Sequence, residues 1–189
     1  DNKPYLIVAP VSLLENWENE YQKFFYPQNL PLCKLYSGVS LTKENNPIQN
    51  HQDAKRLQFK QIILINYETL RLYQISLGLV DFAVIALDEA QKIKTPGTLI
   101  TNASKALKAD FKVAMTGTPV ENTLVDIWCL MDFAVPGLLG NAKDFAKQYQ
   151  KPLNDENTDI KALTEQLRNN IGVFIKRRLK SDVAKDLPK

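Results

Sequence analysis

The stretch Phe82-Ala83-Val84-Ile85-Ala86-Leu87-Asp88-Glu89-Ala90-Gln91 decides the fold. Its first six residues are apolar, which is typical of a strand buried on both faces of a parallel sheet. Asp88 and Glu89 then follow at the carboxyl end of that strand. Because open α/β sheets bind ligands outside the carboxyl ends of their strands, we expect both carboxylates to meet a bound phosphate. An Asp there can hold magnesium, and a neighbouring Glu can orient or deprotonate an attacking water.

The acidic pair has a second interpretation. Asp and Glu stabilise the first turn of a helix through the helix dipole, so the isolated pair can equally mark the start of a helix.

A second polar block favours the ligand-binding interpretation. Phe111-Lys112-Val113-Ala114-Met115 is predicted as another buried strand, and Thr116-Gly117-Thr118-Pro119 ends it with two hydroxyls, a glycine and a proline. Alone, this block also fits an ordinary turn whose threonines cap a helix beginning near Thr123. That turn does not explain why two such blocks follow two strands. Together the blocks predict a nucleotide-driven protein.

Strand-like and helix-like segments alternate along the first 115 residues, which predicts a parallel, doubly wound α/β sheet. Further strands are expected at 5–9, 32–36 and 62–65. Ser12 and Glu15 fit a capping box that opens a helix ending near Phe25, and a second helix is expected from about Tyr67 to Leu77. The polar stretch 40–58 is expected to be a loop with at most one short helix.

The first predicted helix carries apolar residues at helical spacing and is expected to pack this stripe on the sheet. Trp17 is therefore interpreted as a core residue rather than a base-stacking one. The stripe consists of Leu13, Leu14, Trp17, Tyr21, Phe24 and Phe25.

Beyond Asn122 the sequence predicts helices only. One apolar helical face ends at Pro136-Gly137, a second helix is expected at about 142–149, and a third follows the polar loop 154–159. By pattern alone this region is an α-helical appendage.

Composition is that of an ordinary globular protein. The chain has 189 residues, 44% of them hydrophobic and 24% charged, and its net charge of +3 permits nucleic acid without requiring it. His51 is the single histidine, and Cys33 and Cys129 are far apart in the sequence. The chain therefore has too few histidines and cysteines to predict a zinc cluster or a serine-type triad. The cysteines are expected to be reduced. With no apolar stretch long enough to span a bilayer and no signal peptide, the predicted location is cytoplasmic or nucleoid/nuclear, associated with DNA.

Six stretches, in order, resemble the Swi/Snf-type ATPases of the superfamily-two helicases. Lys176 stands where that family usually has Leu, and Gln91 rather than His resembles one of its subgroups. The stretches are 6–17, 63–70, 87–94, 114–122, 136–140, and 174–178 with Leu187-Pro188.

The resemblance implies a RecA-like parallel sheet flanked by helices in three α/β/α layers, with a C-terminal helical protrusion. Residues 1–135 would form a partial first motor lobe, 136–176 the protrusion, and 177–189 the start of a linker to a second lobe. The cofactors implied are ATP and Mg²⁺. Implied partners are duplex DNA, contacted through its backbone, the second lobe and a nucleoprotein substrate, with no membrane.

The resemblance also assigns roles to residues. Asp88 would help hold magnesium, Glu89 would activate water, and Gln91 would act with them while linking nucleotide state to lobe movement. The remaining coupling residues implied are Thr116, Gly117, Thr118 and Asn122. The implied DNA-binding residues are Pro10, Ser12, Leu13, Asn66, Tyr67, Thr69, Arg177 and Arg178.

The basic run Lys176-Arg177-Arg178-Leu179-Lys180 remains open to several interpretations. It can contact DNA phosphates, because Arg pairs with them in bidentate fashion, or help couple the lobes. A short Lys and Arg run is more often a solvated face of a linker.

A phosphate-binding Gly-x-x-x-x-Gly-Lys-Ser/Thr loop does not occur in residues 1–189. We therefore expect the chain to be a fragment of a larger ATP hydrolase, to be inactive alone, and to leave a sheet edge unpaired.

Two alternatives remain. An RNA or restriction-type helicase lobe would share the acidic block, but we do not expect it to combine Asn16-Trp17, the 136–140 stretch and Arg177-Arg178. A non-catalytic nucleic-acid-binding scaffold is disfavoured by the intact Asp88 and Glu89 and by both threonines of the second block.

Overall fold

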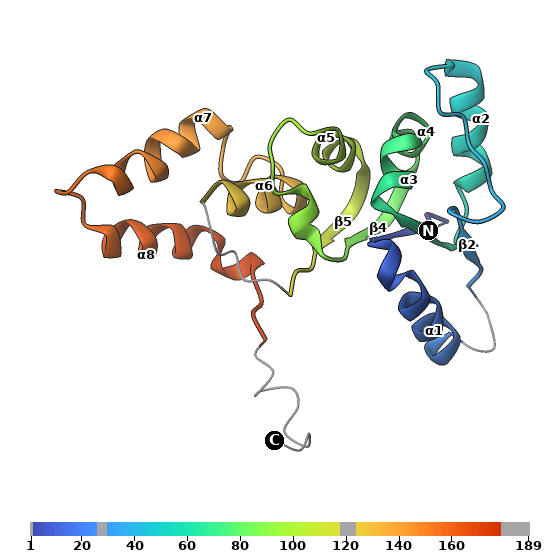
Figure 1. Ribbon diagram of the computed structural model, residues 1–189, viewed down its shortest axis with the longest axis horizontal. Coiled ribbons are helices and arrows are strands. Elements are labelled where there is room, and N and C mark those ends of the chain that lie inside the picture. The colour runs from blue at the N-terminus through green and yellow to red at the C-terminus, as the bar shows by residue number, and fades with distance from the viewer. Residues whose placement is uncertain (1, 26–29, 118–123, 179–189) are drawn as a thin grey trace. The chain divides into compact units, whose positions relative to one another are not determined.

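The computed structural model of the protein describes residues 2–25, 30–117 and 124–178 (Figure 1). Contacts within the chain divide it into two compact units, Asp1–Ala142 and Lys143–Lys189. Each unit is described by itself.

The first unit is built on a sheet of five parallel strands in the order β2-β3-β1-β4-β5. In the register, Leu6 of β1 lies beside Ile63 of β3 on one side and Ile85 of β4 on the other. The parallel α/β sheet predicted from the sequence is thus confirmed. The strands are β1 (Tyr5–Ala9), β2 (Leu32–Lys34), β3 (Ile62–Asn66), β4 (Asp81–Leu87) and β5 (Lys108–Ala114).

Helices cover both faces of the sheet, which confirms the three-layer arrangement (Figure 1). One face packs against α2–α6 and carries the main core, which includes Ile63, Leu70, Phe82 and Phe133. The other face holds a smaller cluster with α1, formed around Ala9, Leu14 and Leu64. The helices are α1 (Leu14–Phe24), α2 (Pro47–Leu57), α3 (Tyr67–Leu72), α4 (Gln74–Gly78), α5 (Leu99–Ala106) and α6 (Leu124–Ala134).

The expectation that the strand at 111–115 is buried was wrong. In the described sheet β5 pairs only with β4, so it forms an edge, and Phe111 is 63% exposed. β4 is also less enclosed than predicted: Phe82, Ile85 and Leu87 are fully buried, but Val84 is only half-buried. A run of apolar residues shows that a strand is apolar, but its number of neighbours depends on the rest of the sheet.

The capping box predicted at Ser12 was also wrong. Residues Val11–Leu13 form a short 3-10 helix, closed by a hydrogen bond of 2.9 Å from the Leu13 N–H to the Pro10 carbonyl, and α1 starts only at Leu14. Ser12 is exposed. The apolar stripe of α1 packs through Leu14 and Tyr21, while Phe24 at the end of the helix is 65% exposed.

The polar stretch 40–58 contains an eleven-residue helix, α2. Asn46 caps it by accepting a hydrogen bond of 3.2 Å from the Gln49 N–H, and Pro47 takes the first helical position, where proline is favoured. Its inner face is partly polar. The Asn50 amide donates to the Ser76 hydroxyl (3.0 Å), and Asp53 accepts the Thr42 N–H (2.7 Å).

Two further helical details differ from the expectation. The helix predicted at 67–77 is divided at Tyr73, whose φ of −109° and ψ of 20° are not helical, into α3 and α4. Helix α5, between β4 and β5, was not predicted at all, although Thr98 caps it in the ordinary way, by accepting a hydrogen bond from the Thr101 N–H.

The second unit is helical. Helix α7 (Ala142–Phe145) leads into a π-helix (Ala146–Gln150) and a 3-10 helix (Pro152–Asn154), and then α8 (Ile160–Ile171) and a last 3-10 turn (Gly172–Phe174) follow. Its buried residues include Phe145 and Tyr149, whose rings are 5.0 Å apart, and Leu167 and Ile171. The described part of the chain contains no helix long and apolar enough to cross a membrane.

Candidate nucleotide site

The two polar blocks lie together at the carboxyl edge of the sheet. β4 and β5 run parallel, with Leu87 paired with Ala114, so the residues that follow each strand are neighbours. Two backbone hydrogen bonds of 2.8 Å join the blocks, from the Met115 N–H to the Leu87 carbonyl and from the Ala90 N–H to the Met115 carbonyl. Strand pairing therefore brings the acidic block beside Thr116.

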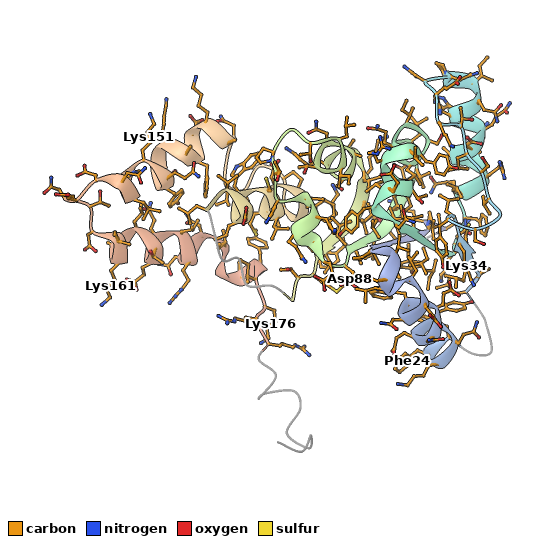
Figure 2. The ribbon with its side chains drawn as sticks, viewed as in Figure 1. Phe24, Lys34, Asp88, Lys151, Lys161 and Lys176 are labelled. Carbon is orange, nitrogen blue, oxygen red and sulfur yellow. The ribbon has the colours of Figure 1, made fainter. Side chains whose placement is uncertain are left out.

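Asp88, whose position is labelled in Figure 2, accepts hydrogen bonds on both carboxylate oxygens. Its Oδ1 accepts the N–H of Glu89 at 2.9 Å, and its Oδ2 accepts the indole Nε1–H of Trp17 at 2.9 Å. The Asp88 N–H itself donates to the carbonyl of Val8 in β1 at 2.8 Å. The side chain is half-buried. Its orientation is thus determined by local backbone and by a residue of α1.

Glu89 has an unusual backbone. Its φ and ψ are both 50°, the left-handed region, and it is the one non-glycine residue with positive φ in the described structure. A four-residue 3-10 helix (Ala90–Ile93) follows, and Glu89 makes no side-chain capping bond to it. The helix-start interpretation of the acidic pair therefore has no capping bond in its favour. Left-handed backbone at a residue with a side chain is costly and tends to occur at functional sites.

Gln91 connects the two blocks through its side chain. Its amide Nε2 donates to the Glu89 carboxylate, and its Oε1 accepts the hydroxyl of Thr116 at 2.7 Å. Gly117 is exposed at the end of the described segment. Thr118 and Asn122, which the sequence also singled out, lie outside the described residues.

The residues after β3 are largely buried. The Tyr67 hydroxyl donates a 2.6 Å hydrogen bond to the Asp88 carbonyl, and the ring is only 5% exposed. Burial, together with the charges of Asp88 and Glu89, raises the pKa of the Tyr67 phenol, so it remains a proton donor at neutral pH. Asn66 accepts the Thr69 N–H at 2.7 Å and caps α3, while Thr69 is buried.

The other predicted nucleic-acid contacts are more accessible. Ser12 is exposed, and Pro10 and Leu13 are half-buried around the 3-10 turn after β1. Arg177 and Arg178 are exposed in the second unit.

Trp17 is the residue near this site that sequence reasoning interpreted differently. It packs beside Ala9 and Leu64, as predicted for a core residue, but its N–H also reaches Asp88. A partly buried tryptophan generally needs a partner for its single donor, which was the available signal.

The donor set fits magnesium that is shared with a phosphate ligand. The described residues contain no group of three or more His, Cys, Asp or Glu arranged to hold a metal. Magnesium, however, commonly binds one or two carboxylates and completes its octahedron with waters and phosphates. Each Asp88 oxygen accepts one hydrogen bond in the structure, and a carboxylate oxygen has a second lone pair for a metal or water.

Comparisons with known proteins show the family of this chain. The model of the SNF2-related domain family matches residues 1–189. Zorya protein ZorD from Escherichia coli O139:H28 is 46% identical over 98% of this chain, and an uncharacterized ATP-dependent helicase from Mycoplasma genitalium is 37% identical over 98%. The chain spans only 18% and 16% of these relatives.

Solved structures show the same fold. The SWI2/SNF2 ATPase core of Sulfolobus solfataricus in complex with dsDNA superposes with a TM-score of 0.77 at 35% identity. The match covers 98% of this chain and 36% of that core.

Proposed function

Because this chain belongs to the SNF2-related domain family and has the fold of a SWI2/SNF2 ATPase core, we propose that it is part of an ATP-dependent DNA translocase that remodels nucleoprotein complexes. Its role is to carry the acidic block and the coupling residues of the first motor lobe. The chain spans about a tenth to a fifth of the length of its curated relatives, so the activity is that of the whole protein.

One observation carries the proposal: Gln91 bonds both to Glu89 and to Thr116. A carboxylate that must orient or deprotonate water is thereby connected to the segment that follows β5. A movement of Thr116 would be transmitted to Glu89 through the Gln91 side chain. We propose this link as the path between nucleotide state and lobe movement, with Gly117, Thr118 and Asn122 continuing it.

The chemistry of these residues suits hydrolysis of a bound nucleotide. Asp88 offers lone pairs for magnesium, and Glu89 accepts a proton from the attacking water or orients it. Magnesium, when bound with ATP, would neutralise charge on the phosphates. The phosphate-binding loop is absent from residues 1–189, so another part of the whole protein would supply it, and the chain alone should hydrolyse no measurable ATP. The edge position of β5 is consistent with a further strand pairing there.

DNA is the proposed partner. The Sulfolobus relative was solved with dsDNA, and Pro10, Ser12 and Leu13 lie at the same carboxyl edge of the sheet as Asn66. Contacts to the DNA backbone carry no sequence information, which suits a motor that steps along any DNA. Tyr67 and Thr69 would act mainly by shaping the start of α3, because their side chains are buried.

The remaining parts of the proposal concern organisation. We place the first motor lobe at residues 1–135, a helical protrusion at 136–176 and a linker toward a second lobe at 177–189, where Arg177 and Arg178 contact DNA or help couple the lobes. A location in the cytoplasm, nucleoid or nucleus with DNA follows from this function.

The test is ATPase activity of the full-length protein, wild type against Glu89→Gln, on duplex DNA, single-stranded DNA and RNA. We expect hydrolysis that duplex DNA stimulates and that the variant loses. Stimulation by RNA alone would instead indicate an RNA helicase. Absence of hydrolysis with every nucleic acid would indicate a binding scaffold.

A further inference from the structure

Within the described residues, the Asp88 side chain accepts one hydrogen bond from a residue distant in the sequence, and Trp17 is its donor. Its Nε1–H donates to Oδ2 at 2.9 Å across 71 positions. The other carboxylate bond comes from the adjacent Glu89 N–H, which is local. Rotation about χ2 of an aspartate is soft, so one local bond leaves the carboxylate plane poorly determined. A second donor on the opposite oxygen fixes that plane.

The hydrogen bond to Asp88 also helps to hold the Trp17 ring in place, because the ring is only half-buried. The ring packs with the cluster of Ala9, Leu14 and Leu64. It also lines a largely apolar cavity of about 410 Å³, which Leu64, Asp88 and Phe24 border as well. The hydrogen bond and this partial packing together hold ring and carboxylate.

We propose that Trp17 is a positioning residue that holds the Asp88 carboxylate in its metal-binding orientation. This inference rests on the proposed function, which gives Asp88 the role of magnesium ligand. Partners that hydrogen-bond a ligating carboxylate orient it toward the metal and sustain its affinity. Because the indole N–H uses one lone pair of Oδ2, it leaves the remaining lone pairs of the carboxylate for the metal and its waters.

Trp17→Phe in the full-length protein removes the donor and keeps an aromatic ring. The measurement is calorimetric binding of ADP with Mn²⁺ and, separately, of ADP with EDTA. We expect binding of Mn²⁺ with ADP to weaken roughly 10-fold, and metal-free ADP binding to stay unchanged. In an Asp88→Asn background the same substitution should produce no further loss, because the two residues act as one unit.

Two control variants separate positioning from general damage. Trp128→Phe removes the other indole donor, which bonds the Gly140 carbonyl at 3.0 Å, and should leave Mn²⁺ binding unchanged. Tyr21→Phe removes a different hydrogen bond of α1, from the Tyr21 hydroxyl to the Leu30 carbonyl at 2.7 Å, and leaves the Trp17 hydrogen bond in place. If Tyr21→Phe weakens Mn²⁺ binding as much as Trp17→Phe does, the effect is structural and the inference fails.

The outcomes also separate this inference from the proposed function. If Asp88→Asn weakens Mn²⁺ binding and Trp17→Phe does not, the positioning role is wrong and the magnesium role stands. If Asp88→Asn itself has no effect, the proposed magnesium ligand is wrong and the inference falls with it. Should Trp17→Phe not fold, Trp17→His, which keeps a ring donor, must retain more Mn²⁺ affinity than Trp17→Leu; equal affinity overturns the inference.

Discussion

Replacing Asp53 with alanine should destabilise the first unit by about 2 to 3 kcal/mol, since a hydrogen bond to a buried charge contributes about 1.5 to 3 kcal/mol. Asp53 is 1% exposed, and its Oδ2 accepts the Thr42 N–H at 2.7 Å. The bond from Ser76 is long, at 3.5 Å, and Arg56, also at 3.5 Å, is largely exposed, so both add little. The loss therefore comes mainly from leaving the Thr42 N–H and the side-chain donors of Thr42 and Gln49 without their acceptor.

Asp53→Asn should cost less, about 1 to 1.5 kcal/mol, because the amide oxygen can still accept the Thr42 N–H but carries no charge. The difference between wild type and Asp53→Asn should depend on pH. Burial acts to raise the pKa of Asp53, but hydrogen bonds from Thr42 and Gln49 and the charge of Arg56 outweigh it and hold the pKa below its usual range. A lowered folded pKa adds stability above the unfolded value of about 3.9, and this stability is lost as pH falls through the folded pKa.

The assay is urea unfolding of the 189-residue chain followed by tryptophan fluorescence. Both tryptophans, Trp17 and Trp128, lie in the first unit and report its unfolding. Asp110→Ala is the matched control: Asp110 pairs with Lys3 at 2.7 Å, but the side chain is 56% exposed, so it should cost at most about 1 kcal/mol. If Asp53→Ala costs no more than Asp110→Ala, the reasoning about the buried network is refuted.

Three further predictions concern other parts of the first unit. Burial raises the pKa of the Cys129 thiol to about 11, so iodoacetamide at pH 8 should modify it only after urea unfolding; rapid labelling of native chain, seen by mass spectrometry, would contradict this. Hydrogen bonds from Lys34 and Tyr36 lower the pKa of Glu18. Wild type should therefore melt at a higher temperature than Glu18→Gln at pH 7, and this difference should shrink at pH 3, as pH falls through the lowered pKa. An equal difference in melting temperature at both pH values would contradict the prediction. Phe111→Ser should reduce any self-association of the chain in sedimentation velocity while changing unfolding free energy by less than about 0.5 kcal/mol, and a large loss would mean that Phe111 is not exposed.

The strands could be predicted because their apolar runs are distinctive, and β1 was predicted with its observed bounds. Helix α2 could not be recognised by apolar periodicity, because its buried face includes Asn50 and Asp53 beside Ala54 and Leu57. Those polar residues are buried only because tertiary partners, such as Ser76, satisfy them. The exposure of β5 could not be predicted from its own residues either, since a strand's neighbours depend on the strand order of the whole sheet.

The meeting of the two polar blocks was predictable from one rule, that parallel strands end at a common edge. Contact between Gln91 and Thr116 follows from that edge. The bond from Trp17 to Asp88 was not predictable, because it depends on how the 3-10 turn directs α1 across the sheet. The left-handed backbone of Glu89 was equally hidden, since nothing in the sequence around an ordinary glutamate indicates positive φ.

That backbone affects the choice of an inactive form for trapping the protein on its ligands. Glutamine at position 89 removes the charge but keeps a side chain, so its left-handed backbone still costs about 1 to 2 kcal/mol, as it does for Glu89. Glycine would remove the charge and also relax the turn between β4 and the following 3-10 helix. Complexes trapped with glycine would therefore mix loss of chemistry with a loosened connection, whereas those trapped with glutamine would preserve the native geometry of the loop.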